Sequence, residues 1–191
     1  MSELSILDLK KRRLTLLGDV NEDMLLKTLL SLDALEAKST TLPITITLSS
    51  CGGDAYDCLG VYDRIKSSPC PITIIGIGPV MSSGTIILQA AKRRLLMENV
   101  RFMIHYGSIE LNEQSAIDAT AYVDFEKAFD RPFMEDVYLT GIKRVRRDFT
   151  RTQIKKLLSK DTFMTANQAV EIGLADGIYT KKTRTKKKRK Q

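Results

Sequence analysis

A serine and a histidine that could act together in nucleophilic catalysis, Ser82 and His105, lie in separate stretches of the chain. Ser82 lies in GPVMSSGTII, residues 78–87, where an apolar strand-like run changes into a helix-like one. A serine hydroxyl becomes a useful nucleophile only when a base takes its proton, a third group orients that base, and donors stabilise the oxyanion. The chain contains one histidine, so His105, at the end of the apolar stretch RFMIH, must be the base if Ser82 is a hydrolase nucleophile.

Backbone amides supply the candidate oxyanion donors. Gly53 follows Gly52 after a strand-like stretch, and the absence of a side chain there lets a substrate carbonyl approach its N–H. Ser83 offers a second N–H at the start of the next helix, whose dipole favours negative charge. Spacing alone does not select the orienting acid, because 23 Asp and Glu residues are available and Asp161 could equally cap a turn.

Each of these residues also has an ordinary structural explanation. A serine before a helix is common in turns, a Gly-Gly pair after a strand is often only a turn, and a histidine ending an apolar strand is often a satisfied, partly buried residue. The catalytic interpretation therefore depends on their occurrence together in one chain.

The basic charge of the chain is concentrated at one end. The formal charge is +7, but eight of the 30 Lys and Arg residues lie in 181–191, which leaves 22 basic against 23 acidic residues elsewhere. We expect residues 1–180 to form one domain and 181–191 to be a disordered basic tail. Binding of nucleic acid or another acidic partner is expected only through that tail.

Cysteine usage and hydropathy bear on the compartment. Cys51, Cys58 and Cys70 are odd in number and lack metal-site spacing, so we expect a reduced, cytoplasm-like or organelle-matrix environment and no metal or other cofactor. The start of the chain has no long apolar signal-peptide core, and no run reaches the roughly 18 residues of a membrane span. We therefore expect a protein that is not secreted and has no membrane partner.

The pattern of elements predicts an α/β fold. Strand-like stretches at 14–18, 43–50 and 71–78 alternate with helix-like stretches at 21–38, 54–68 and 83–91. This βαβαβα order favours a largely parallel sheet covered by helices, which binds ligands at the carboxyl ends of its strands. Both Gly52-Gly53 and Ser82 fall at such ends. Short strands at 93–97 and 101–105 follow.

The C-terminal part is predicted to be mainly helical. The region 113–147 is too long for an ordinary surface helix without a partner. Two capping boxes, Thr150 with Gln153 and Thr165 with Gln168, mark later helix starts, and Gly173 is the expected glycine after the second of these helices.

Four motifs in the correct order resemble the proteolytic subunit of Clp protease, a family of self-compartmentalising serine peptidases. They are TLSSCGGDA for the Gly-Gly turn, GPVMSSG for the nucleophile turn, RFMIH for the histidine strand, and DTFMTANQAVEIGLAD for the acid segment. The resemblance extends from about Arg13 to Tyr179. It implies Ser82 as nucleophile, His105 as base, Asp161 as acid, and the amides of Gly53 and Ser83 as oxyanion hole.

The resemblance also implies an architecture and partners. The expected fold is the Clp-protease and crotonase-like α/β spiral of βαβ units forming a head, with 113–147 as a projecting handle. Members form rings, usually of seven subunits, that stack through the handles into a barrel. The implied activity is ATP-dependent proteolysis of unfolded polypeptides as a serine endopeptidase with an AAA+ unfoldase.

The sequence departs from the family pattern at several positions, which keeps alternatives open. Cys51 replaces the proline before Gly-Gly, Ser83 replaces a methionine, and Tyr106-Gly107 replaces Gln-Pro after the histidine. Only about a dozen residues precede the first strand, fewer than the family's axial-gate segment. These features predict a divergent member. The alternatives are a catalytically silent ring subunit or assembly factor, and a virus-maturation protease of the same chemistry.

Overall fold

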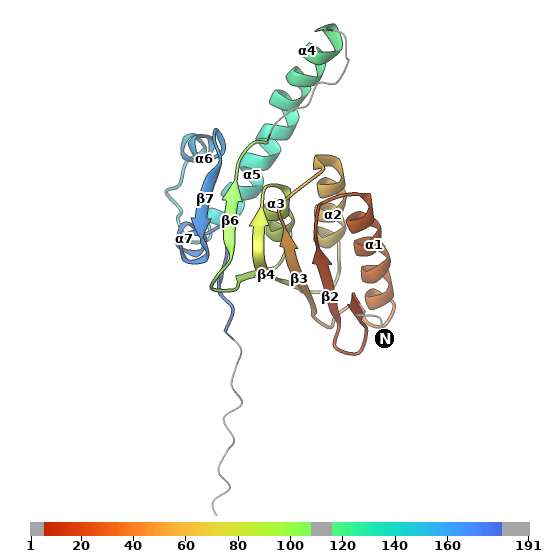
Figure 1. Ribbon diagram of the computed structural model, residues 1–191. Helices are drawn as coiled ribbons and strands as arrows, with labels where there is room; N and C mark the ends of the chain where they lie inside the picture. Colours follow the sequence, from red (N-terminus) through yellow and green to blue (C-terminus); the bar gives the residue numbers. More distant parts are fainter. Residues whose placement is uncertain (1–5, 108–115, 181–191) are drawn as a thin grey trace, which may run out of the picture.

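The computed structural model of this chain describes residues 6–107 and 116–180 (Figure 1). Its strands are β1 (Leu7–Asp8), β2 (Arg13–Leu17), β3 (Ile44–Ser50), β4 (Ile72–Met81), β5 (Arg93–Leu96), β6 (Arg101–Ile104), β7 (Thr162–Thr165) and β8 (Gly177–Ile178). Its helices are α1 (Glu22–Glu36), α2 (Ala55–Lys66), α3 (Ser83–Gln89), α4 (Ala116–Phe125), the π-helical segment η1 (Glu126–Asp130), α5 (Arg131–Ile142), α6 (Arg151–Leu158) and α7 (Ala166–Ile172).

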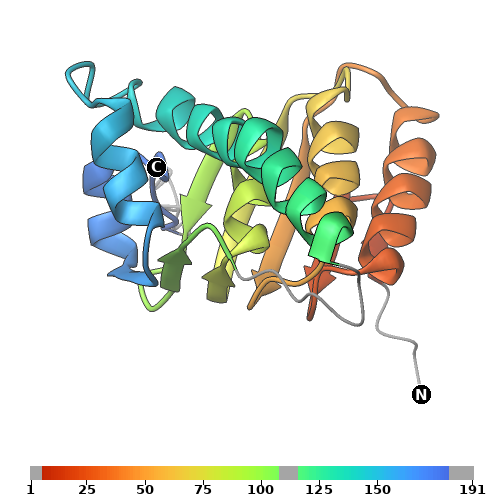
Figure 2. The same cartoon turned by 90° about the horizontal axis from the view of Figure 1, so that it is seen from above.

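All the described strands belong to one largely parallel sheet, which confirms the predicted α/β arrangement. The main path runs β1-β2-β3-β4-β5-β8, and β6 branches from β4 and pairs with β7. Only the β1–β2 and β6–β7 pairs are antiparallel. The helices α1, α2 and α3 connect the parallel strands, and Figures 1 and 2 show α1 and α2 side by side against the sheet.

The sheet has one face more deeply buried than the other. Along β3, buried residues alternate with half-buried ones, so Ile44, Ile46 and Leu48 point into the core while Thr45 and Thr47 lie on the opposite face. A period of two with β-branched residues is the pattern of a half-buried strand. The more deeply buried face carries the apolar residues that form the core between the sheet and its connecting helices.

Local helix signals in the sequence are confirmed. Asn21 caps α1, since its side chain accepts a hydrogen bond from Met24 N, and both predicted capping boxes are present at the starts of α6 and α7. Gly173 follows α7 with a φ of 96°, the left-handed conformation expected there. These caps fix where the helices begin and end without requiring tertiary contacts.

The predicted helical region at 113–147 is shorter and less regular than expected. Helix α4, η1 and α5 follow one another from Ala116 to Ile142, and residues 113–115 lie outside the described residues. After Ile142 the chain turns, with the amides of Lys143, Val145 and Arg146 donating to carbonyls of the last helical turn. Figure 1 shows α4 projecting away from the sheet, whereas α5 packs beside α3.

Strand β4 changes its partner part way along, and this change shapes the site. Residues 73–76 pair with β5, whereas residues 79–81 pair with β6. A bulge interrupts the pairing with β3 between Leu48 and Ser50, and Gly78 takes a φ of 58° between the two halves. The sequence predicted a strand ending at Gly78. The strand instead continues to Met81, alongside β6.

Candidate active site

Ser82 follows β4 directly and has a strained backbone. Its φ of 49° and ψ of −129° are rare for a residue with a side chain. Two fixed neighbours hold it in place: Ser82 N donates to Met103 O at 2.9 Å, and Ser82 O accepts from Thr85 Oγ1 at 2.6 Å. Its hydroxyl makes no capping hydrogen bond to α3. The sharp strand-to-helix turn therefore presents the hydroxyl outward.

Two glycines allow segments of the chain to approach each other closely around this serine. A Cβ on Gly52 would lie 2.6 Å from Ser82 Cβ, and a Cβ on Gly84 would lie 3.2 Å from Ser50 Cβ. Gly52 also has a φ of 110°, and its N–H donates to the hydroxyl of buried Ser50 at 3.0 Å. Glycine is therefore needed at Gly52 for both space and conformation, whereas a side chain at Gly84 would require Ser50 to shift slightly.

The pairing of β6 with β7 brings His105 next to Asp161. The register joins Ile104 to Thr162, so His105 and Asp161 occupy the next positions of the two antiparallel strands. His105 Nδ1 lies 2.8 Å from Asp161 Oδ1, and His105 Nε2 lies 2.8 Å from Ser82 Oγ. The His105 side chain is 23% exposed and that of Asp161 is 60% exposed. The three side chains form one continuous chain of hydrogen bonds from the acid to the hydroxyl.

The Gly52-Gly53 turn is fixed by Val20, which lies after β2. Val20 N donates to Gly52 O at 2.9 Å, and Asp54 N donates to Val20 O at 2.8 Å. A Cβ on Gly53 would lie 2.2 Å from Val20 O, so the backbones are in direct contact. On its other side, Gly53 O accepts a hydrogen bond from Ser83 Oγ at 3.2 Å. Gly53 is thus held between Val20 and the start of α3.

The structure brings together every residue that the sequence singled out: Ser82, His105 and Asp161 through their side chains, and Gly53 and Ser83 through the hydrogen bond from Ser83 Oγ to Gly53 O. Within the described ranges, neither the Gly53 nor the Ser83 amide donates to a protein acceptor. The sequence did not identify Val20, Ser50 or Met103 as supports of the site. They act through backbone groups or a buried hydroxyl, which leave no recognisable sequence motif.

Two of the cysteines lie near the site in different environments. Cys58 is buried on α2 and its thiol donates to Ser83 O at 3.3 Å. Burial raises the pKa of the Cys58 thiol to about 12, with a smaller effect in the same direction from Asp54. Cys58 is therefore a packing residue rather than a nucleophile at neutral pH. Cys51, beside the glycine turn, is exposed.

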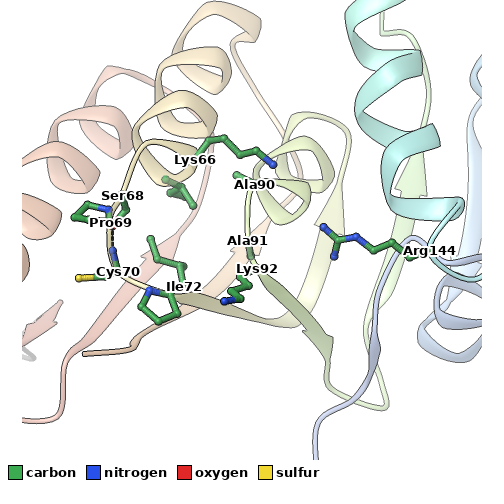
Figure 3. A pocket seen from close by; sticks show the side chains of 11 residues that line it. Lys66, Ser68, Pro69, Cys70, Ile72, Ala90, Ala91, Lys92 and Arg144 are labelled. Atoms are coloured by element: carbon green, nitrogen blue, oxygen red, sulfur yellow. Dashed lines mark hydrogen bonds between the residues drawn. The ribbon is translucent and has the colours of Figure 1, made fainter. Parts of the chain in front are cut away.

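A cavity in the described part of the chain lies away from these residues (Figure 3). It has a volume of about 370 Å³ and lies where β4 and β5 begin, beside Ile72 and Lys92. Its cationic residues are Lys66, Lys92 and Arg144. Helices α2 and α3 end at this edge of the sheet, and cations are favourable near helix C-termini. Arg144 also lies 3.7 Å from Asp176.

In residues 6–107 and 116–180, no group of three His, Cys, Asp or Glu side chains is placed to hold a metal ion. No helix in the same ranges is long and apolar enough to span a bilayer.

Comparison with known proteins places the chain in a family that fits this fold and site. The Clp protease family matches residues 3–182, and the chain therefore belongs to that family. One similar protein is the ATP-dependent Clp protease proteolytic subunit 2 of Treponema denticola. It is 30% identical over 175 residues, which cover 89% of this chain and 82% of the relative. The predicted family resemblance is confirmed.

Proposed function

We propose that this chain is a serine endopeptidase that hydrolyses peptide bonds through Ser82, His105 and Asp161. The observation that carries the proposal is the pair of 2.8 Å contacts that join the hydroxyl to the imidazole and the imidazole to the carboxylate. That geometry matches the requirement for nucleophile, base and orienting acid in acyl transfer. Membership of the Clp protease family supports the same reaction class.

Each residue has a defined role in the proposed reaction. His105 Nε2 accepts the proton of Ser82 Oγ as the oxygen attacks the peptide carbonyl, and then gives that proton to the leaving amine. Asp161 accepts a hydrogen bond from His105 Nδ1–H, which selects the tautomer and stabilises the imidazolium. Water attacks the resulting acyl-Ser82 by the same route in reverse, which releases the acid product and restores the hydroxyl.

The amides of Gly53 and Ser83 are the proposed oxyanion donors. Both lie beside Ser82, and neither amide is used by another protein acceptor among the described residues. Fixed backbone donors stabilise a developing oxyanion without reorganisation during the reaction. The contact of Gly53 with Val20 and the hydrogen bond from Ser83 Oγ hold both donors at the nucleophile.

The proposed substrates are unfolded polypeptides, degraded inside a ring-shaped assembly with an ATP-driven unfoldase. The relative from Treponema denticola carries the words ATP-dependent and proteolytic subunit in its name, which supports this assignment. Exposed aromatic residues on α4 and η1 support self-association: Phe125 is 48% exposed and Phe129 is 62% exposed, with ring centroids 4.8 Å apart. Such a surface is suited to burial between the handles of stacked rings.

Replacement of Ser82 by alanine tests the proposed chemistry. We expect hydrolysis of unstructured fluorogenic peptides to fall by about 10⁴-fold or more, because the nucleophile is lost while the fold is kept. The matched control is Ser67→Ala, which removes an exposed hydroxyl at the far end of α2, where it donates to Arg64 O. Activity in Ser82→Ala close to that of the control would rule out Ser82 as nucleophile.

Light scattering on the same samples tests the assembly. We expect both variants to elute as ring-sized particles, because neither Ser67 nor Ser82 lies on α4 or η1, the proposed contact surface between rings.

A further inference from the structure

The residue after His105 is tied to a buried carboxylate on α5. Tyr106 Oη donates to Glu135 Oε1 at 2.7 Å, and Glu135 is only 2% exposed. Burial raises the pKa of the Tyr106 hydroxyl, and the adjacent Glu135 carboxylate raises it further, so the hydroxyl remains a protonated donor. The Arg131 guanidinium lies 4.9 Å from the centroid of the Tyr106 ring. Tyr106 is thus held at its ring and at its hydroxyl.

Glu135 also holds the helix that leads to Asp161. Arg151, the first residue of α6, donates to Glu135 Oε2 at 2.8 Å, and Lys155 Nζ lies 3.9 Å from Glu135 Oε1. Arg151 pairs with Asp136 as well. At the other end of α6, Leu158 O accepts from Tyr106 N at 2.9 Å. One carboxylate therefore contacts both the segment after His105 and the helix before Asp161.

These contacts lie where the sheet no longer fixes the backbone. Strand β6 ends at Ile104, so His105 has no ladder partner of its own in the described strands. Gly107 follows with a φ of 92°, a left-handed conformation that favours glycine and turns the chain away from the strand. Tyr106 stands between His105 and Gly107, so its contacts with Glu135 and Leu158 anchor the chain just after β6.

We propose that Tyr106 and Glu135 are positioning residues, which hold His105 against Ser82 and Asp161 through the Tyr106–Glu135 hydrogen bond. The inference rests on the proposed peptidase function. It adds two residues outside the Ser82, His105 and Asp161 set that hold the imidazole in place. Small displacements of a catalytic base cost rate rather than substrate binding. The pair therefore acts on kcat, with little effect on KM.

The substitution Tyr106→Phe removes only the hydroxyl and keeps the ring against Arg131. Glu135 remains paired with Arg151 and Lys155, so the variant is expected to fold. The matched control is Tyr62→Phe. Tyr62 is partly buried and packs edge-on against Phe133 of α5, the helix that carries Glu135, at 5.6 Å between ring centroids. It stands on α2, away from the residue that follows His105.

The kinetic readout uses peptide hydrolysis per active site, titrated with a fluorophosphonate. We expect kcat of Tyr106→Phe to fall about tenfold with KM within about twofold of the wild type. Tyr62→Phe is expected to keep both constants. Wild-type kcat in Tyr106→Phe, or an equal loss in both variants, would overturn the positioning role.

The single histidine provides a second readout that does not need turnover. In protein labelled with ¹⁵N-histidine, we expect the Nδ1–H proton that faces Asp161 to exchange with water about tenfold faster in Tyr106→Phe than in Tyr62→Phe or the wild type. If the wild type proved inactive but this difference appeared, the proposed function would fail and the positioning role would stand. Equal exchange in all three proteins would overturn the positioning role.

Discussion

At its carboxyl end, β4 leads into Ser82, whose φ of 49° is accompanied by two backbone hydrogen bonds and by Gly52, where a side chain would collide with Ser82. At its amino end, the same strand begins at Ile72, beside a cavity of about 370 Å³ lined by three cations and no acid. The strand has ten residues, so the two ends are about 30 Å apart. The cavity lies beside two helix ends with their ordinary attraction for cations, whereas the strained turn lies beside the hydrogen-bonded Ser82, His105 and Asp161 side chains.

The difference teaches that a chemical site is recognised by convergent groups rather than by empty volume. The Ser82, His105 and Asp161 side chains come from three separate segments and meet at 2.8 Å contacts. Lys66 and Lys92 instead lie where α2 and α3 end, so the helix carbonyls explain their presence. Substitutions at the two ends of β4 should therefore separate activity from stability.

Gly52→Ala should have the largest effect on activity in this comparison. The new Cβ would lie 2.6 Å from Ser82 Cβ and would displace the nucleophile, so we expect kcat/KM to fall by about 10²-fold or more. The control is Gly18→Ala, which has a similar φ of 97° against 110° for Gly52 but no atom within 4 Å of the new Cβ. Both variants carry the same kind of backbone strain, so only the contact with Ser82 differs. Comparable activity in the two variants would mean that the Gly52 contact is not needed.

Asp176→Asn should alter stability at the other end of the sheet and leave the chemistry intact. Asp176 accepts from Arg94 N at 2.7 Å and from Arg94 Nε at 3.2 Å, and the Arg94 side chain is only 1% exposed. The substitution leaves a buried guanidinium without its carboxylate, so we expect a loss of about 3 kcal/mol in the free energy of unfolding. Urea unfolding at pH 7 measures it, with activity at low temperature as the control.

The same pair predicts a pH dependence. Burial alone would raise the pKa of Asp176, but the hydrogen bonds from Arg94 outweigh it and the pKa lies below its ordinary value. A depressed carboxyl pKa adds stability above the unfolded value of about 4, and this contribution disappears as the pH falls through the folded value. The difference between wild type and Asp176→Asn should thus be constant near neutrality and shrink below about pH 4. A difference that grew in acid would contradict this assignment.

Lys92→Gln should have the smallest effect. It removes one cation of the cavity near the end of α3, so we expect a stability loss of only about 0.5 kcal/mol and kcat/KM within about twofold of the wild type. Thermal unfolding and peptide hydrolysis measure the two quantities. A tenfold loss of activity in folded Lys92→Gln would show that the two ends of β4 are not independent.

The sequence was most informative where structure is local. Asn21, the two capping boxes and Gly173 mark the helix boundaries because a cap depends on a few neighbouring residues. The extension of β4 through Pro79 was missed because it depends on β6, about twenty residues further along the chain. The short strands β1 and β8 were missed for the same reason, since two residues show no periodicity.

For the candidate site, the order of motifs predicted which residues to examine, but not how they are held. Asp161 could not be chosen from spacing, because its place beside His105 follows from the antiparallel register of β6 and β7. The role of Glu135 as a contact to both Tyr106 and Arg151 depends on how α5 packs against α3 and α6. Such supports arise from tertiary packing and have no sequence motif of their own.

Labelling with a fluorophosphonate followed by peptide mapping tests the central claim most directly. This reagent forms a stable adduct only with a serine whose hydroxyl is activated by a base. We predict one adduct per chain, on Ser82, and its loss in His105→Gln. An adduct on another serine, or labelling of Ser82 that is unchanged in His105→Gln, would contradict activation of Ser82 by His105.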